Sequence, residues 1–257
     1  MKITIIGVGN MGGAIARGLA SDSLKGEHQI CITNRSVAKL NSLKEECPSL
    51  NVETSFQEAV NYADLIILAV KPWVMEDLVK SLQFKPTQII ASVAAGINFE
   101  QLSTWAPGVR HFYRIIPNTA IALKQSMNII ASYGNDAAMD DLIIHLFNHL
   151  GTSLLLPEEK MDAATSISSC GIAYVLKYLQ AAMQAGVELG LTPHEAKEMA
   201  AQSAIGAGSI LLSHKDSHPS VEIDKVTTPG GLTIKGINEL DKQGFVTAII
   251  EAIKKSS

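Results

Sequence analysis

Three glycines near the amino terminus have the spacing of a turn that binds phosphate groups. They lie in Gly7-Val8-Gly9-Asn10-Met11-Gly12, directly after the apolar run at 2–6 and directly before an apolar helical stripe that begins at Ala14. In such a unit the first glycine permits a tight turn, the second lets the backbone approach a pyrophosphate, and the third lets helix and strand pack closely. The phosphates meet the free N–H groups of the helix. The segment therefore predicts a dinucleotide site, with a plain structural turn as the alternative.

The residues that end the second predicted strand favour NADP(H) over NAD(H). NAD sites usually carry an Asp or Glu there to bind the ribose hydroxyls. This chain instead has Asn34, Arg35 and Ser36. Arg35 offers a planar cation to a 2'-phosphate, and the other two side chains offer hydrogen bonds. The alternative for Arg35 is a solvated loop arginine, and NAD(H) is kept as the alternative cofactor.

A second glycine-rich segment, at 226–236, has the residues of an anion site at the start of a helix. Thr228 is a good N-cap and Pro229 a good first helical residue, which would place the next two glycines in the first turn. Glycines there leave backbone N–H groups open to a carboxylate. Thr233 lies on the same helical face as Pro229, so its hydroxyl would reach a heteroatom of the ligand. A glycine-rich loop before a packed helix is the alternative.

Composition limits the class of protein. The chain has 257 residues, of which 47% are hydrophobic, so it can bury the core of one large domain or two ordinary ones. Its net charge of -4 and lack of a basic cluster disfavour nucleic acid as a partner. The longest apolar run, at 65–70, is far shorter than the roughly 20 residues that cross a bilayer. Three widely spaced cysteines suit a reducing compartment. We expect a soluble, cytoplasmic protein without a membrane contact.

The order of the predicted elements indicates an α/β fold. Strand signals occur at 2–6, 29–33, 65–70, 88–93, 110–115, 128–132 and 152–156. Helical spacing of apolar residues occurs at 10–22, 36–46, 72–83, 98–105 and 136–149. This alternation predicts a Rossmann-type, mainly parallel sheet that forms an NADP-binding domain over 1–156.

The strand signals stop after Pro157, and the remainder is predicted to be entirely helical. Gly190 ends one helix, and Thr192 with Glu195 forms a capping box that starts the next. A thin helical domain this apolar could not cover its own surface. We therefore expect 157–257 to be a substrate-binding and dimerisation domain that forms a homodimer, with a higher oligomer of dimers as an extension.

Together these residues resemble the pyrroline-5-carboxylate reductase family, which reduces a cyclic imine to L-proline with NAD(P)H. The similarity spans essentially the whole chain. It is carried by the glycine turn at 7–12, Ala69-Val70-Lys71-Pro72, Ala94-Ala95-Gly96, Pro117-Asn118-Thr119, Asp162-Ala163, Ala173-Tyr174 and the segment 226–236.

The resemblance implies a set of site residues. The cofactor cleft would be lined by Ala69, Val70, Lys71, Pro72, Ala94, Ala95 and Asn118, in addition to the glycine turn and 34–36. The cyclic imino acid would be bound by Thr228, Gly230, Gly231, Leu232 and Thr233, with Glu158 facing the cleft. Thr233 would be the catalytic residue, because its hydroxyl lies at the ring nitrogen, where charge changes during hydride transfer. The alternative for Glu158 is that its carboxylate only stabilises the first turn of a helix and contacts no ligand.

Several departures from the family pattern fall near the predicted site. Ser168-Ser169-Cys170-Gly171-Ile172-Ala173 replaces Ser-Gly-Ser-Gly-Pro-Ala, and Ala120 replaces a proline. Ser55 or Phe56 stands where an asparagine contacts cofactor. A redox role for Cys170 is weighed against a simple packing replacement.

Two other functions stay open, and a metal site is not predicted. A β-hydroxyacid dehydrogenase would begin with a similar turn but would need a catalytic lysine, for which Lys177 is the candidate. A non-catalytic NADP-binding regulator is the other alternative, suggested by Ser169, Cys170, Ile172 and Ala120. The histidine pairs His145/His149 and His214/His218 have helical spacing but no third metal ligand.

Overall fold

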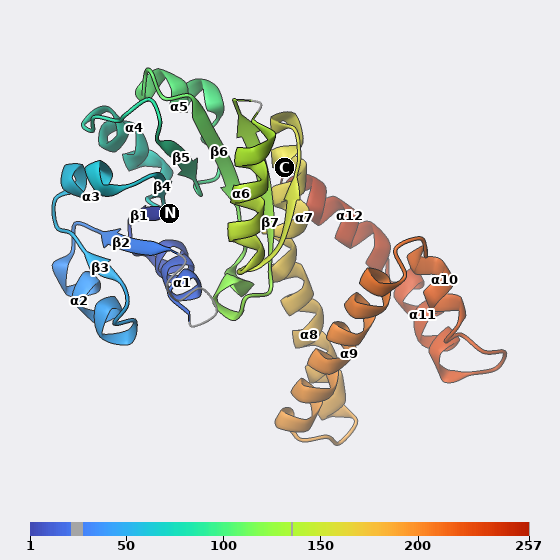
Figure 1. Ribbon diagram of the computed structural model, residues 1–257. Coiled ribbons are helices and arrows are strands. Elements are labelled where there is room, and N and C mark those ends of the chain that lie inside the picture. Colours follow the sequence, from blue (N-terminus) through green and yellow to red (C-terminus); the bar gives the residue numbers. More distant parts are fainter. Residues whose placement is uncertain (22–27, 135, 257) are drawn as a thin grey trace. The chain divides into compact units, whose positions relative to one another are not determined.

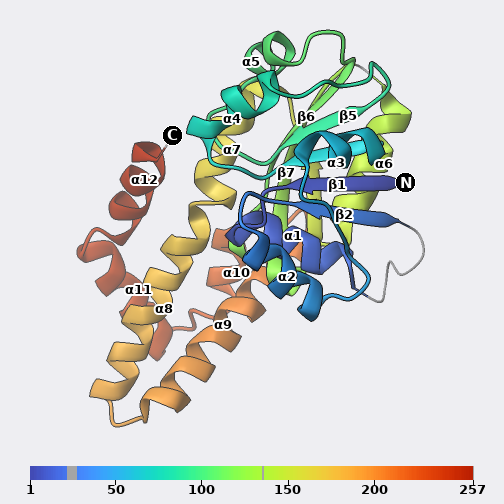
Figure 2. The same ribbon diagram turned by 90° about the vertical axis from the view of Figure 1, so that its left-hand side faces the viewer.

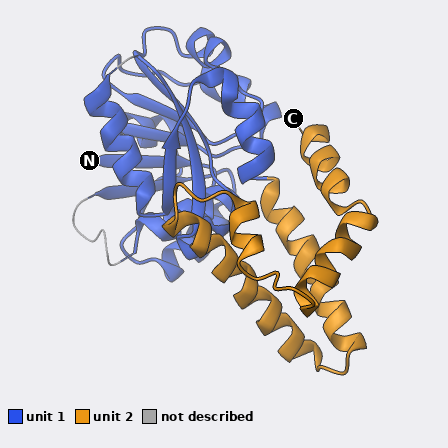
Figure 3. Ribbon diagram, turned by 90° about the vertical axis from the view of Figure 1, so that its right-hand side faces the viewer, with its two compact units in different colours: residues 1–169 blue, residues 170–257 orange. Residues whose placement is uncertain are grey.

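The computed structural model describes residues 1–21, 28–134 and 136–256 and divides into two compact units, Met1–Ser169 and Cys170–Ser257 (Figure 3). The sequence divided the chain after Leu156 instead. The structure differs because the segment after Leu156 belongs to the core of the first unit, where Met161 is fully buried.

The first unit is built on one sheet, which contains eight strands in the described residues. They are β1 (Lys2–Ile6), β2 (Gln29–Thr33), β3 (Asn51–Val52), β4 (Leu65–Leu68), β5 (Ile89–Ser92), β6 (His111–Ile116), β7 (Ser126–Tyr133) and β8 (Gly151–Leu155). Their spatial order is β3-β2-β1-β4-β5-β6-β7-β8, and only the β6–β7 pair is antiparallel. The mainly parallel sheet is confirmed. β3 was missed because a two-residue strand shows no alternation.

Helices cover both faces of this sheet (Figures 1 and 2). They are α1 (Asn10–Leu19), α2 (Val37–Glu46), α3 (Phe56–Tyr62), α4 (Pro72–Lys80), α5 (Phe99–Trp105), α6 (Ala137–Asn148) and α7 (Met161–Ser168), with 3-10 turns η2 (Thr119–Leu123) and η3 (Glu158–Lys160). Successive residues of β1 and β4 alternate between two buried apolar clusters, as a strand requires. One cluster lies under α1, α2 and α6, and the other under α3, α4, α5 and α7. α1 ends at Leu19, and the predicted end at residue 22 lies outside the described residues.

The direction of chain progression reverses between β1 and β4. From β1 the chain moves through β2 to the edge at β3, then returns to β4 and proceeds to β5 and β6. In open parallel sheets such a reversal leaves a crevice at the carboxyl ends of the strands, where ligands bind. The segments at 7–12, 34–36, 69–72, 94–95 and Asn118 all follow the carboxyl ends of these parallel strands.

The second unit is helical, as predicted. It contains α8 (Gly171–Glu188), α9 (Pro193–Ser213), α10 (Pro219–Asp224), α11 (Leu232–Lys242) and α12 (Phe245–Lys255). The predicted capping box is confirmed: Glu195 N donates to Thr192 Oγ1 at 3.3 Å, and Thr192 N donates to Glu195 Oε2 at 2.8 Å. After α11 and its C-cap Gln243, Gly244 has φ +76°, the left-handed conformation in which many helices end.

The second unit encloses almost no core of its own. Among its described residues only Ala196 is fully buried. Large apolar side chains are exposed on every long helix, including Leu176, Ile205, Leu212 and Val246. Exposed apolar surface of this extent marks an interaction face. No described helix is long and apolar enough to span a membrane.

The predicted start of α11 at Thr228 is wrong. The helix begins at Leu232 and its N-cap is Gly231. Thr228 O accepts a hydrogen bond from Gly231 N at 2.9 Å, and Gly230 has φ +74°. Proline followed by a residue with positive φ is the pattern of a type II turn, which favours glycine at that position. The Pro-Gly turn signal therefore prevailed over the Thr-Pro capping signal, and the glycines precede the helix.

Candidate active site

The glycine turn after β1 is packed tightly against the segment that follows β4. Gly7 has φ +99°, and its N–H donates to Thr33 O at 2.8 Å. A Cβ on Gly7 would lie 2.7 Å from Ala69 O, and one on Gly12 would collide with Gly7 O. Both positions therefore require glycine, one for a left-handed turn and the other for close packing of α1.

Gly9 differs from the other two glycines because it faces open space. It is the N-cap of α1, no side chain caps this helix end, and a Cβ on Gly9 would have no atom within 4 Å. Val8 is buried, Met11 is half-buried and Asn10 is exposed. The first N–H groups of α1 are thus available to an anion such as a pyrophosphate.

The segment after β2 has a second uncapped helix end. Ser36 is the N-cap of α2 without a side-chain hydrogen bond to the helix, and Asn34 Nδ2 donates to Ser36 O at 3.3 Å. The Arg35 side chain is exposed. A helix end, a hydroxyl and a guanidinium are therefore close in sequence at the place where a 2'-phosphate is expected.

The segments after β4 and β5 continue the same edge of the sheet. Ala69 N donates to Ile6 O at 2.8 Å, so this segment is anchored beside the glycine turn. Lys71 is the N-cap of α4, Pro72 is its first residue, and Lys71 Nζ lies 5.8 Å from the centre of the Trp73 ring. After β5, Ala94 is buried and Ala95 is exposed. Val70 is half-buried against Gly7.

Asn118 follows β6 at this edge, but its side chain is used within the first unit. Only 4% of the residue is exposed. Its Oδ1 accepts from Ala120 N at 3.0 Å, which caps η2, and its Nδ2 donates to Ser168 O at 3.0 Å. Ser55, at the position of the family asparagine, is the N-cap of α3 and accepts from Glu58 N at 3.3 Å.

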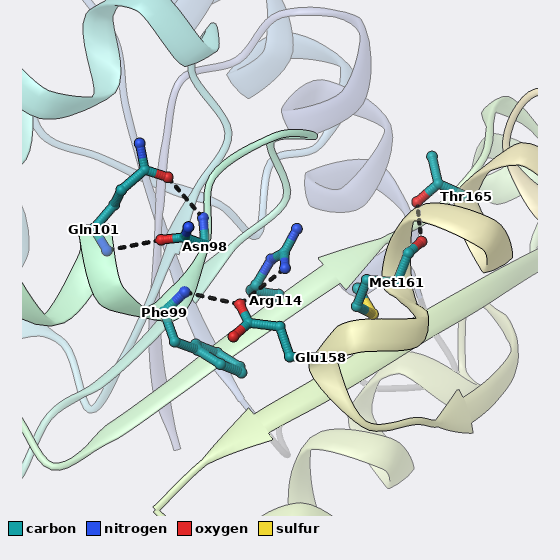
Figure 4. Close-up of polar contacts among 7 residues, drawn as sticks. All are labelled: Asn98, Phe99, Gln101, Arg114, Glu158, Met161 and Thr165. Atoms are coloured by element: carbon teal, nitrogen blue, oxygen red, sulfur yellow. Dashed lines mark hydrogen bonds and ion pairs between the residues drawn. The ribbon is translucent and has the colours of Figure 1, made fainter. Parts of the chain in front are cut away.

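Glu158 makes two interior contacts, shown in Figure 4. Its Oε1 accepts from Phe99 N at 2.8 Å and from Arg114 Nη1 at 2.8 Å. The Arg114 side chain is only 7% exposed. The sequence analysis did not identify Arg114 as a site residue. One signal was present, because Arg114 is the charged residue in the otherwise uncharged segment Phe112–Ile116 of β6. The remaining residue of this strand is His111.

The predicted substrate segment lies in the second unit and is open to solvent. Thr228, Gly230 and Thr233 are exposed, and Leu232 is 86% exposed. No side chain caps α11, so the N–H groups at its start are open to an anion. The Thr233 hydroxyl belongs to the first turn of this helix. These groups supply the donors that a small carboxylate requires.

The cysteines and histidines do not form a third reactive cluster in the described residues. Burial raises the pKa of the Cys31 and Cys47 thiols, which makes them poor nucleophiles. His145 Nε2 lies 3.4 Å from His149 Nε2, and no group of three or more metal-ligating side chains occurs in the described ranges. His218 caps α10 by accepting from Ser220 N at 3.2 Å, and His214 lies 3.4 Å from Glu222.

Comparison with known proteins identifies relatives for both parts of the chain. A model described as pyrroline-5-carboxylate reductase dimerisation matches residues 158–257, and one described as coenzyme F420-dependent NADP oxidoreductase matches residues 2–96. Pyrroline-5-carboxylate reductase 1 of Dictyostelium discoideum is 36% identical over 99% of this chain and 48% of the relative, so the chain spans about half of that protein. Pyrroline-5-carboxylate reductase of Arabidopsis thaliana is 34% identical over 99% of this chain and 94% of the relative.

A solved structure shows the same fold. The pyrroline carboxylate reductase of Plasmodium falciparum, with NADP bound, is 25% identical and superposes with a TM-score of 0.85 over 100% of this chain and 95% of that one.

Proposed function

The chain belongs to the pyrroline-5-carboxylate reductase family, and we propose that it reduces L-1-pyrroline-5-carboxylate to L-proline by hydride transfer from NADPH, the last step of proline biosynthesis. It is an NAD(P)H-dependent oxidoreductase that acts on a C=N bond. The observation that carries the proposal is the open amino end of α1 at Gly9, which lies where the strand order reverses and is preceded by a closely packed glycine turn.

The dinucleotide is assigned to the carboxyl edge of the sheet. The free N–H groups of α1 bind the pyrophosphate, and Gly9 lacks the side chain that would block it. The uncapped end of α2 together with Arg35 binds the 2'-phosphate, which favours NADPH over NADH. Ala69, Val70, Lys71, Pro72, Ala94 and Ala95 line the remaining cofactor surface. When bound, NADPH supplies the hydride that the imine carbon receives.

The imino acid is assigned to the segment Thr228–Thr233. The N–H groups at the start of α11 bind the carboxylate, because they are uncapped and carry the positive end of the helix dipole. Gly230 and Gly231 shape the turn that presents these groups. The exposed side chains of Thr228 and Leu232 border the bound ring.

Thr233 is the proposed catalytic residue. Its hydroxyl donates a hydrogen bond to, or accepts one from, the ring nitrogen, whose charge changes as the C=N bond is reduced. A protonated imine is already electrophilic, so holding the two reacting carbons close together supplies much of the acceleration. A strong general acid is therefore not required. Positioning of the two ligands is the main task of the protein.

We propose that the functional assembly is a homodimer formed through the helical unit. The support is the lack of an enclosed core in this unit together with its match to a dimerisation model. Sedimentation at several concentrations would report the dimer and any further association. The proposed location is the cytoplasm, where the three free cysteines stay reduced.

Steady-state kinetics with purified protein test the proposal. We expect NADPH oxidation with pyrroline-5-carboxylate, a lower kcat/KM with NADH, and no turnover of a β-hydroxyacid with NADP. Oxidation of the β-hydroxyacid without reduction of the imine would favour the dehydrogenase alternative. NADPH binding without turnover of either substrate would favour a regulator.

A further inference from the structure

The carboxylate of Glu158 joins two elements of the first unit that are far from it in sequence. The same oxygen, Oε1, accepts from the backbone N–H of Phe99, 59 positions earlier, and from the guanidinium of Arg114, 44 positions earlier (Figure 4). Phe99 is the first residue of α5, and Arg114 lies inside β6. Glu158 itself begins η3, and Met161 three positions later is fully buried.

Arg114 fixes the position of this carboxylate. Its side chain is 7% exposed, its Nε is buried without a hydrogen-bond partner, and no second carboxylate lies within salt-bridge distance in the described part of the chain. A buried guanidinium without its counter-charge is strongly unfavourable. The pair therefore holds Glu158 in one place, although a third of the Glu158 side chain is exposed.

Glu158 also completes the capping of α5. Asn98 and Gln101 form a capping box in which Asn98 Oδ1 accepts from Gln101 N and Gln101 Oε1 accepts from Asn98 N, each at 2.9 Å. The box leaves Phe99 N unsatisfied, and Glu158 accepts from it. A negative charge is favourable at this end of a helix. The start of α5 is thus held by both a local and a long-range acceptor.

Phe99, whose N–H is bound by Glu158, follows the loop that carries Ala94 and Ala95. This loop leaves β5 at Ser92, whose Oγ accepts from Ala94 N at 3.3 Å, and passes through Gly96 at φ +77°. With the adenosine end of the dinucleotide assigned beside β2, its nicotinamide end would lie past the reversal point, toward β4 and β5. The loop at 94–96 would therefore lie beside the reacting half of the cofactor.

We propose that Glu158 is a positioning residue rather than a substrate ligand: held by Arg114, it fixes Phe99 and thereby the 94–96 loop against the nicotinamide. This inference rests on the proposed function and replaces the substrate contact expected for Glu158 from sequence. Arg114 acts indirectly, by holding the Glu158 carboxylate in place. Both residues affect catalysis through the geometry of the loop.

Three variants distinguish a positioning role of Glu158 from a substrate-binding role. Glu158→Gln keeps an acceptor for Phe99 N but removes the counter-charge of Arg114, and Arg114→Met removes the guanidinium but keeps the carboxylate. Glu159→Gln is the matched control, because the neighbouring Glu159 is exposed and forms no ion pair in the described residues. Arg114→Lys, which keeps a buried positive charge, serves if Arg114→Met does not fold.

We expect Glu158→Gln and Arg114→Met each to lower kcat by about tenfold while KM for pyrroline-5-carboxylate stays within about twofold, because a charged hydrogen bond that orders the loop is lost. Hydrogen exchange of a peptide covering 93–102 should accelerate in both variants and stay unchanged in Glu159→Gln. Exchange at 7–12 should not change in any of them.

An increase of about tenfold or more in KM for the imino acid in Glu158→Gln, with kcat and exchange unaffected in Arg114→Met, would overturn the inference and restore Glu158 as a substrate ligand. If the wild-type protein did not reduce pyrroline-5-carboxylate, the proposed function would fail separately. The exchange measurement and the NADPH affinity of the three variants would still decide whether Glu158 holds the loop.

Discussion

Gly7 and Gly12 of the 7–12 turn are enclosed by backbone, whereas Gly230 of the 228–233 turn borders open space. A Cβ on Gly7 would approach Ala69 O to 2.7 Å, but one on Gly230 would meet no atom within 4 Å. Gly230 is needed for its φ of +74°, and not for space. The first turn is packed within its own unit. The second turn presents backbone N–H donors on a surface that the other helices of its unit leave exposed.

This difference follows the two kinds of core. The first unit buries two apolar clusters on either side of a sheet, and the segments of its ligand edge extend directly from strands of this packed sheet. The helical unit has one buried residue among those described, Ala196. Its exposed apolar side chains require contact with another protein surface to become buried. We infer that the cofactor edge is preformed and that the substrate turn depends more strongly on assembly.

The largest expected effect comes from adding one methyl group to the first turn. Gly12→Ala should lower the free energy of unfolding by about 3 kcal/mol and abolish NADPH binding, because the new Cβ collides with Gly7 O. Gly9→Ala is the matched change, since the same methyl group meets no protein atom within 4 Å.

Gly9→Ala should leave the free energy of unfolding within about 0.5 kcal/mol of wild type yet weaken NADPH binding by at least about tenfold, since it obstructs the open helix end. Urea unfolding and fluorescence titration with NADPH report the two quantities. Full NADPH affinity in Gly9→Ala would exclude the end of α1 as the pyrophosphate site.

A smaller effect is expected at the second turn. Gly230→Ala places a side chain at φ +74°, which costs about 1–2 kcal/mol and distorts the turn before α11. A distortion of this energy should raise KM for pyrroline-5-carboxylate by about tenfold and leave NADPH affinity unchanged.

The control for that change is Gly236→Ala, inside α11, where a Cβ has open space. It should stabilise the helix by about 1 kcal/mol and leave KM unaltered. Equal effects of the two substitutions on KM would show that the turn geometry is not what binds the substrate.

The smallest effect concerns cofactor choice. Arg35→Gln should lower kcat/KM for NADPH by about tenfold and change that for NADH by less than about twofold, because only the 2'-phosphate loses a charged partner. Parallel assays with both cofactors measure this ratio. A uniform loss with both cofactors would indicate that the exposed Arg35 side chain does not contact the 2'-phosphate.

Local signals were sufficient for much of the first unit. Each predicted strand occurs because buried parallel strands form apolar runs such as Leu65–Leu68, and the glycine spacing located the turn beside them. The start of α11 was wrong because Thr-Pro and Pro-Gly signals overlap, and only the three-dimensional context selects between them. The Glu158–Arg114 pair could not be predicted, since 44 positions separate residues that only the folded sheet brings together.

The most direct test of the account is the turnover of Thr233→Val, measured with an NADPH titration on the same preparation. The substitution keeps the shape of the side chain and removes only the hydroxyl at the start of α11. We expect kcat with pyrroline-5-carboxylate to fall by about a hundredfold, NADPH affinity to stay within about twofold, and Thr233→Ser to recover most of the activity. Wild-type turnover in Thr233→Val would contradict the assignment of substrate and catalysis to the second turn.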